Sequence, residues 1–337
     1  MQLENTTPFA ADLNFAFEKT GRELVIIAIK ATFDFAAQGT VALPSEDQRP
    51  LLYSDEFGQD PEKDATRFEN DFAPFKHHCD VLCDGSAIAP NGRPVTALHV
   101  GLRLGQWSKA FGIIGHRIWL RSAMGHRVSD PRPFTEMAIN YETAWGGTDP
   151  DPDTPGHAAT FEKNPSGLGF YPHRRDLEGA PLPVTHELGT DVASKSGDYR
   201  PMALGPIGRH WLPRRKFAGT YDQDWLDRRM PFLPDDFDSR YFQAAPPDQQ
   251  IPYLMGGEPI ELYNLTTEGR LGFFLPQELL TVTFHRKSGP VTQKVPPIDT
   301  VQVLAAERQL TLTWRTRFAC DRDIHDLSEI IIRRGTG

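Results

Sequence analysis

Short apolar runs and alternating patterns dominate both ends of the chain, and they predict strands rather than helices. Residues 13–17 and 23–35 flank Gly21 and predict a hairpin. Its second arm opens as a continuous apolar run and then alternates with polar residues at Lys30 and Thr32. Further strand patterns occur at 78–84, 95–104, 109–120, 258–265, 270–275, 278–286, 301–304 and 309–318. We expect a mainly β fold, an antiparallel β-sandwich or a meander-rich single large domain with long irregular insertions and a few short helices.

We expect one domain over residues 1–337. Its parts are a β-rich region at 1–130, an irregular, motif-rich region at 131–257 and a second β-rich region at 258–337. Together, the 28 glycines and 29 prolines are a larger share of the 337 residues than the roughly 12% that these two residue types make up in an average chain. This excess favours many turns. A short helix is expected at 62–69, and residues 330–332 are expected to close a sheet edge.

The stretch from Trp211 to Gln250 is dense in aromatics, prolines and charges, yet it has neither a helical nor an alternating period. Aromatic rings bury much apolar area, and proline restricts the backbone, so we expect an ordered but non-repetitive segment. Within it, Thr220 is expected to cap a short helix over residues 222–229. Any one aromatic here fits a core position, whereas the segment as a whole favours partner binding.

The candidate partner-binding residues are the aromatic, proline and polar side chains of that segment: Tyr221, Trp225, Arg228, Phe237, Tyr241, Phe242, Pro246, Pro247, Asp248 and Gln249. Tyrosine, tryptophan, phenylalanine and arginine are the types enriched at protein interfaces. This composition predicts recognition rather than catalysis.

Charge and cysteine content narrow the classes of function. A net charge of −9 argues against nucleic-acid binding, which needs a basic surface for the phosphates. Three cysteines make no disulfide framework and favour a reducing compartment. No secretory signal is evident, and the most apolar run, Leu24–Ile29, is far shorter than the roughly 20 residues of a membrane span. We therefore expect a cytoplasmic protein without membrane insertion.

Two sets of residues suggest chemistry. His77, His78, Cys79 and Cys83 have half of the ligands of a zinc site, but no second pair follows, and both cysteines fall on one strand face that suits a buried position. We expect no metal or cofactor. The carboxylates of Asp235, Asp236 and Asp238 leave a carbohydrate hydrolase open as an alternative. A carbohydrate-binding β-sandwich, with Trp and Tyr as sugar platforms, is a further alternative.

Five short motifs follow one another along the chain: YETAWGG at 141–147, NPSGLG at 164–169, FAGTYDQDWL at 217–226, LPDDFD at 233–238 and RYFQAAPPDQQ at 240–250. This ordered set resembles the bacterial domain of unknown function 2169 family (DUF2169), which is associated with type VI secretion loci. Each is short, whereas their order is specific, and the resemblance covers about residues 10–315.

This resemblance implies a non-catalytic adaptor or chaperone. Such proteins bind a secreted effector, through its N-terminal or PAAR-containing region, and help to load it onto the VgrG spike before injection. The family has no established catalytic residues to transfer to this chain. Long irregular segments on a β scaffold suit this role, and a sheet edge could add a strand from the client.

Overall fold

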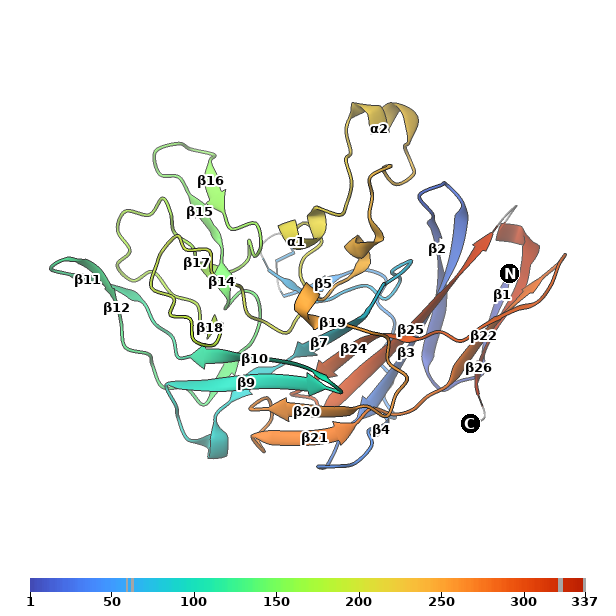
Figure 1. Cartoon of the computed structure of the whole chain (residues 1–337), viewed down its shortest axis with the longest axis horizontal. Coiled ribbons are helices and arrows are strands. Elements are labelled where there is room, and N and C mark those ends of the chain that lie inside the picture. The colour runs from blue at the N-terminus through green and yellow to red at the C-terminus, as the bar shows by residue number, and fades with distance from the viewer. Residues whose placement is uncertain (59, 62–63, 321–323, 336–337) are drawn as a thin grey trace.

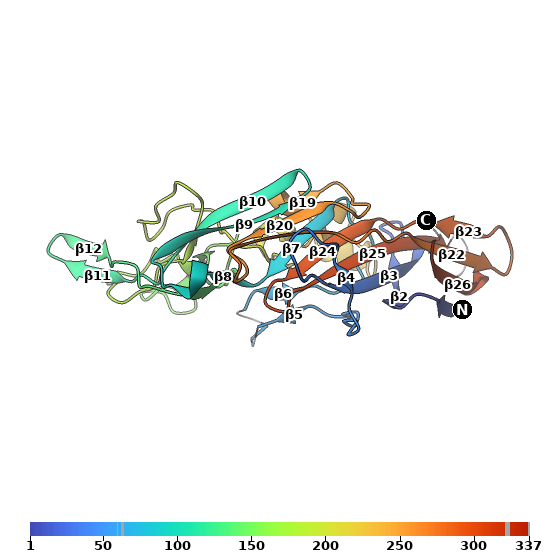
Figure 2. The same ribbon diagram turned by 90° about the horizontal axis from the view of Figure 1, so that it is seen from below.

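Two large sheets face each other across the main apolar core of the protein (Figures 1 and 2). The computed structural model describes residues 1–58, 60–61, 64–320 and 324–335. The larger sheet has seven strands within these residues: β19 (Gln250–Ile251), β7 (Cys79–Asp84), β24 (Ile298–Leu304), β25 (Gln309–Cys320), β3 (Glu23–Asp34) and β2 (Ala10–Phe17) in this order, with β4 (Leu43–Pro44) paired to β3. The facing sheet has the order β18 (Thr185–His186), β10 (Trp107–Ile114), β9 (Ala97–Leu104), β20 (Pro259–Tyr263) and β21 (Arg270–Phe274).

A smaller sheet lies at one end of the elongated molecule (Figure 2). Its order is β1 (Gln2–Asn5), β26 (Leu327–Arg334), β22 (Leu280–Arg286) and β23 (Thr292–Lys294). The remaining strands of the described residues form two-stranded pairs: β5 (Glu56–Phe57) with β6 (Thr66–Phe68), β8 (Ser86–Ile88) with β13 (Glu136–Ala138), β11 (Trp119–Ser122) with β12 (Gly125–Val128), β14 (Trp145–Gly146) with β17 (Leu168–Gly169), and β15 (Thr148–Pro150) with β16 (Ala158–Thr160).

Helices are few and short, as the sequence predicts. The α-helices are α1 (Leu212–Arg215) and α2 (Gln223–Arg228), and the 3₁₀ turns are η1 (Pro90–Gly92), η2 (Ser239–Phe242), η3 (Pro247–Gln249) and η4 (Ile324–Asp326). None of the helices in the described ranges has the length and apolar character needed to cross a membrane. The mainly β architecture is confirmed.

Two local predictions are wrong. Residues 66–68, expected within a helix, form strand β6, which pairs with β5. Residues 330–332 do not close an edge, because β26 is flanked by β22 and by the parallel strand β1. Most strand pairs in the large sheets are antiparallel, as expected, while β1 with β26 and β7 with β24 run parallel. These parallel pairs join segments far apart in the chain, so no local pattern reveals them.

Strand β3 has two buried faces, and this property positions the functional residues. Val25, Ile27 and Ile29 are fully buried in the core between the two large sheets. The alternate residues point to the opposite face, where Ile26 packs against Phe72 from the segment that covers it. The predicted hairpin of β2 and β3 is confirmed, with Phe17 opposite Glu23.

Candidate functional site

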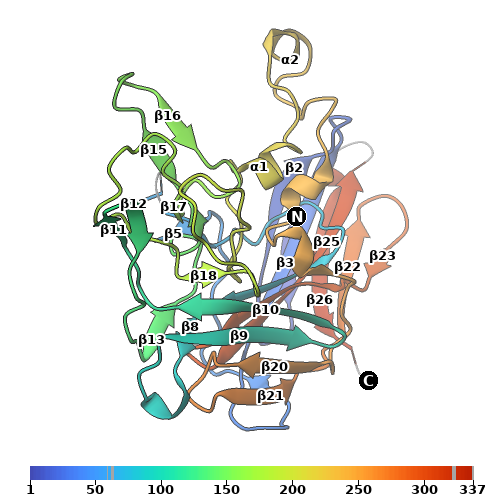
Figure 3. The same ribbon diagram turned by 60° about the vertical axis from the view of Figure 1, so that its left-hand side comes forward.

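The most prominent feature of the predicted partner-binding segment is a projection, here called the arm, formed by residues 217–238. Helix α2 lies at its tip, well away from the sheets (Figures 1 and 3). The base is closed by a hydrogen bond from Asp238 N to Phe217 O at 3.0 Å. The Arg240 guanidinium lies 4.3 Å from the centre of the Phe217 ring. The arm is therefore an ordered unit with its own closing contacts.

Local interactions within the arm explain why this irregular sequence is ordered. Asp222, not Thr220, caps helix α2, because its side chain accepts the Trp225 backbone N–H at 2.9 Å. The Thr220 hydroxyl donates instead to the Asp236 carboxylate at 2.7 Å. The Trp225 ring packs edge-on to Tyr221 at 4.8 Å, and its Nε1 donates to Phe232 O. Trp225 thus forms the small internal core of the arm.

A groove separates the arm from the turn between β2 and β3. Phe232 contacts Phe17 edge-on at 5.5 Å, and Arg229 donates to Lys19 O at 2.5 Å. The cavity at this junction has a volume of about 270 Å³. Its walls are mainly apolar, formed by Phe17, Glu18, Lys19, Thr20, Leu24, Pro74, Phe75, Leu233, Phe237, Ser239, Phe242 and Arg317.

Large apolar side chains are exposed on the two elements that flank this groove, the arm and β2. Tyr221, Leu226 and Met230 on the arm are 53%, 48% and 61% exposed. Phe15 and Phe17 on β2 are 54% and 45% exposed. Exposed apolar side chains on the elements that flank an apolar groove are typical of a protein-binding surface.

The ten predicted residues do not form one surface. The exposed ones are Tyr221, Arg228 and Pro247, and the half-buried ones are Trp225, Phe237, Tyr241, Phe242, Pro246 and Asp248. Of these, Phe237 and Phe242 line the groove. Gln249 is fully buried, so its assignment to a partner surface is corrected.

Gln249 and Asp248 belong to a structural contact instead. Gln249 Oε1 accepts a hydrogen bond from the Lys109 ammonium at 2.6 Å, and Gln249 Nε2 donates hydrogen bonds to Val81 O and Leu204 O. Asp248 lies 3.0 Å from the same ammonium. Burial lowers the pKa of Lys109 to about 8, although the Asp248 carboxylate opposes this shift. These contacts tie η3 to β10, and the local sequence pattern holds no signal of them.

The carboxylates of the alternative hydrolase site lack the properties of a general acid. Hydrogen bonds from Thr220 lower the pKa of Asp236, and the bond from Arg240 lowers the pKa of Asp238. Asp235 and Asp236 are exposed. A glycosidase acid needs a raised pKa in a substrate cleft, so this arrangement gives no support to hydrolysis.

The cysteines occupy the predicted buried face of β7. Cys79 and Cys83 are 0% and 2% exposed, and their burial raises the pKa of both thiols well above the usual range. Among the residues that the structure describes, no group of three His, Cys, Asp or Glu side chains could hold a metal ion. Cys79 and Cys83 are core residues here.

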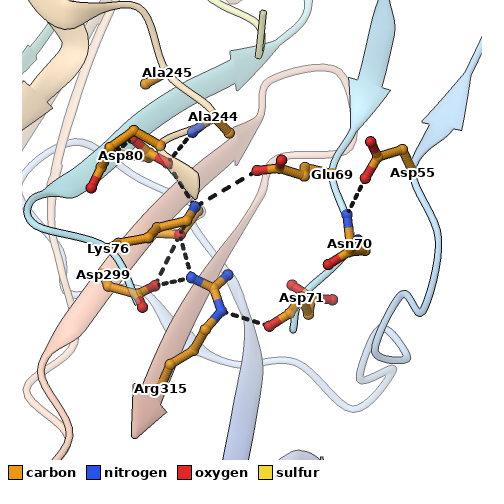
Figure 4. Close-up of polar contacts among 12 residues, drawn as sticks. Asp55, Glu69, Asn70, Asp71, Lys76, Asp80, Ala244, Ala245, Asp299 and Arg315 are labelled. Atoms are coloured by element: carbon orange, nitrogen blue, oxygen red, sulfur yellow. Dashed lines mark hydrogen bonds and ion pairs between the residues drawn. The ribbon is translucent and has the colours of Figure 1, made fainter. Parts of the chain in front are cut away.

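A second polar site, which the sequence does not predict, lies on the outer face of the seven-stranded sheet (Figure 4). We call it the charged cluster; it consists of Lys30, Glu69, Asp71, Lys76, Asp80, Asp299 and Arg315. The Lys76 ammonium donates to Asp80 at 2.6 Å and to the Thr300 hydroxyl at 3.0 Å. Lys30 donates to Asp71 at 2.9 Å, and Arg315 to Asp299 at 2.5 Å. Each of these side chains is at least nine-tenths buried.

Side chains from the motif-rich segment complete the network. The Asp80 carboxylate accepts hydrogen bonds from Gln243 Nε2 at 2.7 Å and from the backbone N–H of Ala244 at 2.8 Å. Arg214 donates to Glu69 and to Tyr241 O. The base of the arm is therefore attached to the same charged cluster that links the strands.

Burial and neighbouring charges act in opposite directions on the acids of this cluster. Burial alone would raise the pKa of Glu69, but the positive charges of Arg214, Arg209 and Lys76 lower it to about 2. Burial raises the pKa of Asp299 despite the nearby Arg315. A signal for the cluster exists in the sequence, since Lys30, Asp80 and Arg315 interrupt otherwise apolar or Thr-rich strands. Their partners, however, come from distant segments.

Comparison with known proteins identifies a family. Residues 20–315 match the family described as "Uncharacterized protein conserved in bacteria (DUF2169)". No curated protein and no solved structure matches the chain significantly. Because the match spans most of the sequence, including the arm and the charged cluster, this chain belongs to the DUF2169 family.

Proposed function

We propose that this protein is a non-catalytic adaptor that binds a type VI secretion effector in the cytoplasm and helps to load it onto the VgrG spike. The observation that carries the proposal is the groove between the arm and β2, with exposed apolar side chains on both sides. The partner is an extended apolar segment of the effector, from its N-terminal or PAAR-containing region.

The edge position of β2 supports strand addition by such a segment. Strand β2 is the last strand of the sheet on the side of the arm, and Phe15 and Phe17 lie on it. The backbone N–H groups of Leu13 and Phe15 donate to the side chains of Asp12 and Asn14 at 2.7 and 2.8 Å. These local bonds can exchange for carbonyl groups of an added strand, while the groove receives alternate side chains.

The resemblance on which the type VI role rests includes this site. The motifs at 217–226, 233–238 and 240–250 form the arm and its base. An adaptor must hold its client without modifying it, so broad apolar contact framed by polar groups suits the role. For a carbohydrate-binding module, Trp225 would need an open ring face, whereas Tyr221 packs against it and Nε1 is already bonded.

The experiment is co-expression with neighbouring effector genes, followed by pull-down and a binding titration with the captured effector segment. Recovery of an effector at micromolar protein concentration is expected. Recovery of none would contradict the proposal.

A matched pair of substitutions tests the site itself. Met230 on the arm and Met124, which is 99% exposed in the β11–β12 turn, are both surface methionines. We expect Met230→Asp to weaken effector binding by about tenfold or more, because it places a charge in an apolar contact. Met124→Asp is expected to leave binding unchanged, and both variants keep the thermal stability of the parent. Equal effector binding by the two variants would indicate that the effector binds at another site on the protein.

A further inference from the structure

A second cavity lies directly above the charged cluster, under a covering segment made of residues 49–56 and 68–71. Its volume is about 190 Å³, well above the roughly 30 Å³ that one water occupies in the liquid. Four adjacent strands, β7, β24, β25 and β3, provide the floor, and the covering segment provides the walls. Its lining includes Leu52, Phe68, Glu69, Lys76, Leu82 and Gln302.

Two buried polar atoms of this cavity are left without a hydrogen bond among the described residues. One is the donor Nε2 of Gln302, whose residue is 7% exposed. The other is the acceptor Oε2 of Glu69, which lies 4.0 Å from the Lys76 ammonium. Buried polar groups are normally satisfied, because an unpaired one has lost its hydrogen bonds to water without gaining a partner in the protein. A ligand with one hydrogen-bond acceptor, for Gln302 Nε2, and one hydrogen-bond donor, for Glu69 Oε2, would satisfy both atoms.

The charges around the cavity restrict the ligand further. Lys30, Lys76 and Arg315 each contact a carboxylate, from Asp71, Asp80 and Asp299 respectively. Since these cations are already neutralised, an ionic ligand would bring an unpaired charge into a buried site, at a large cost. A neutral molecule avoids this cost.

The cavity also has apolar walls. Leu52, Phe68 and Leu82 line the cavity beside the polar atoms. We propose that this cavity binds a small neutral molecule with both a hydrogen-bond acceptor and a donor on a short apolar body. A primary carboxamide is the simplest such group. It is present in free aliphatic amides and in the side chain of glutamine.

The test uses the full chain, with propionamide as the probe and the side-chain amide resonance of Gln302 as the readout in ¹⁵N NMR titrations. Propionamide is expected to shift this resonance with a millimolar Kd, as suits a ligand of a few atoms. Propionate, which has the same shape and a charge, is expected to bind at least tenfold more weakly. N-acetyl-glutamine methylamide distinguishes the sources: binding as tight as that of propionamide indicates a peptide, and weaker binding indicates a free amide.

Substitution of Gln302 supplies the control. In Gln302→Leu and Gln302→Met, a ligand-observed titration should give at least tenfold weaker binding of propionamide, with thermal stability kept or raised, because an unpaired donor is removed. Gln293→Leu, at an exposed position of β23, should bind like the parent. An unmoved Gln302 resonance, equal binding of propionate, or unchanged binding in both Gln302 variants would overturn the proposal. Effector capture by the arm is independent of each of these outcomes.

Discussion

The arm and the charged cluster use similar residue types in opposite ways. On the arm, the pair of Arg228 and Asp224 has both side chains more than half exposed. In the cluster, the pair of Lys76 and Asp80 is 2% and 0% exposed. Water screens the first pair, whereas the second must balance its own loss of hydration through partners on several strands. The same types of charge therefore stay hydrated on the arm, whereas on the sheet face each charge depends on its partners in the network.

The two regions also differ in how far their contacts reach along the chain. Within the arm, the contacts join residues close in the chain, such as Asp222 with Trp225 and Thr220 with Asp236, and Phe232 and Arg229 attach the arm to the β2–β3 turn. The cluster joins Lys30 to Asp71 and Gln243 to Asp80, which are 41 and 163 residues apart. A unit closed by local contacts can open by itself, while the cluster is lost only when the main sheet unfolds.

The largest expected effect is that of removing one buried charge. Lys76→Met should lower the free energy of unfolding by about 3–5 kcal/mol, because Asp80 and Glu69 lose a buried cation. Urea denaturation of the parent and the variant measures this change. A loss below about 1 kcal/mol would mean that the cluster is hydrated like the arm.

The pH dependence of stability tests the same network through Glu69. Its pKa in the folded protein is about 2, below the ordinary value of 4.5, so its stabilising contribution is present above pH 4.5 and is lost as the pH falls towards 2. That contribution is roughly 3 kcal/mol. We expect Glu69→Gln to lose this part of the acid sensitivity, as measured by urea unfolding between pH 5 and 2. An unchanged acid profile would contradict the ion contacts of Glu69.

Trp225→Ala should act on the arm alone. The variant removes the packing on Tyr221 and the bond to Phe232 O, so amide protection should fall within residues 217–238. The global free energy of unfolding should change by less than about 1 kcal/mol, since the arm can open locally. Hydrogen exchange read by mass spectrometry checks both statements. Loss of protection throughout β3 and β25 would show that the arm is part of the main folding unit.

The smallest effect is expected for an exposed charge. Arg228→Met removes the pair with Asp224 and should cost roughly 0.2–0.5 kcal/mol, a loss that decreases further in high salt. It serves as the counterpart of Lys76→Met, since both replace a long cation by methionine. Similar losses in the two variants would remove the distinction between the regions.

Much of the fold was predictable because its signals are local. The hairpin of β2 and β3 follows from an apolar run interrupted by Gly21, whose φ of 84° suits a turn. Cys79 and Cys83 lie on the buried face that alternation predicts. The sequence pattern places the helix cap at Thr220, two residues before the observed cap Asp222, because both residue types are good caps.

The candidate site was predictable only in part, for a related reason. Aromatic density points to the arm, and Phe237 and Phe242 do line its groove. The other wall comes from β2 and from Phe75, which are about 160 or more residues away in the chain. Likewise, Gln249 in η3 contacts Lys109 of β10, which is 140 residues away in the chain.

The sequence by itself determined the β-rich class, the short helices and the ordered, aromatic character of residues 211–250, because periodicity, glycine turns and ring content act over a few residues. Only the tertiary structure decided which aromatics remain exposed, that β26 is an inner strand, and that Lys30, Asp80 and Arg315 lie together. Pairing between distant strands brings these side chains together and removes water from them. Because the partners lie far apart in the chain, a local pattern shows a polar residue within a strand but not the residue that it contacts.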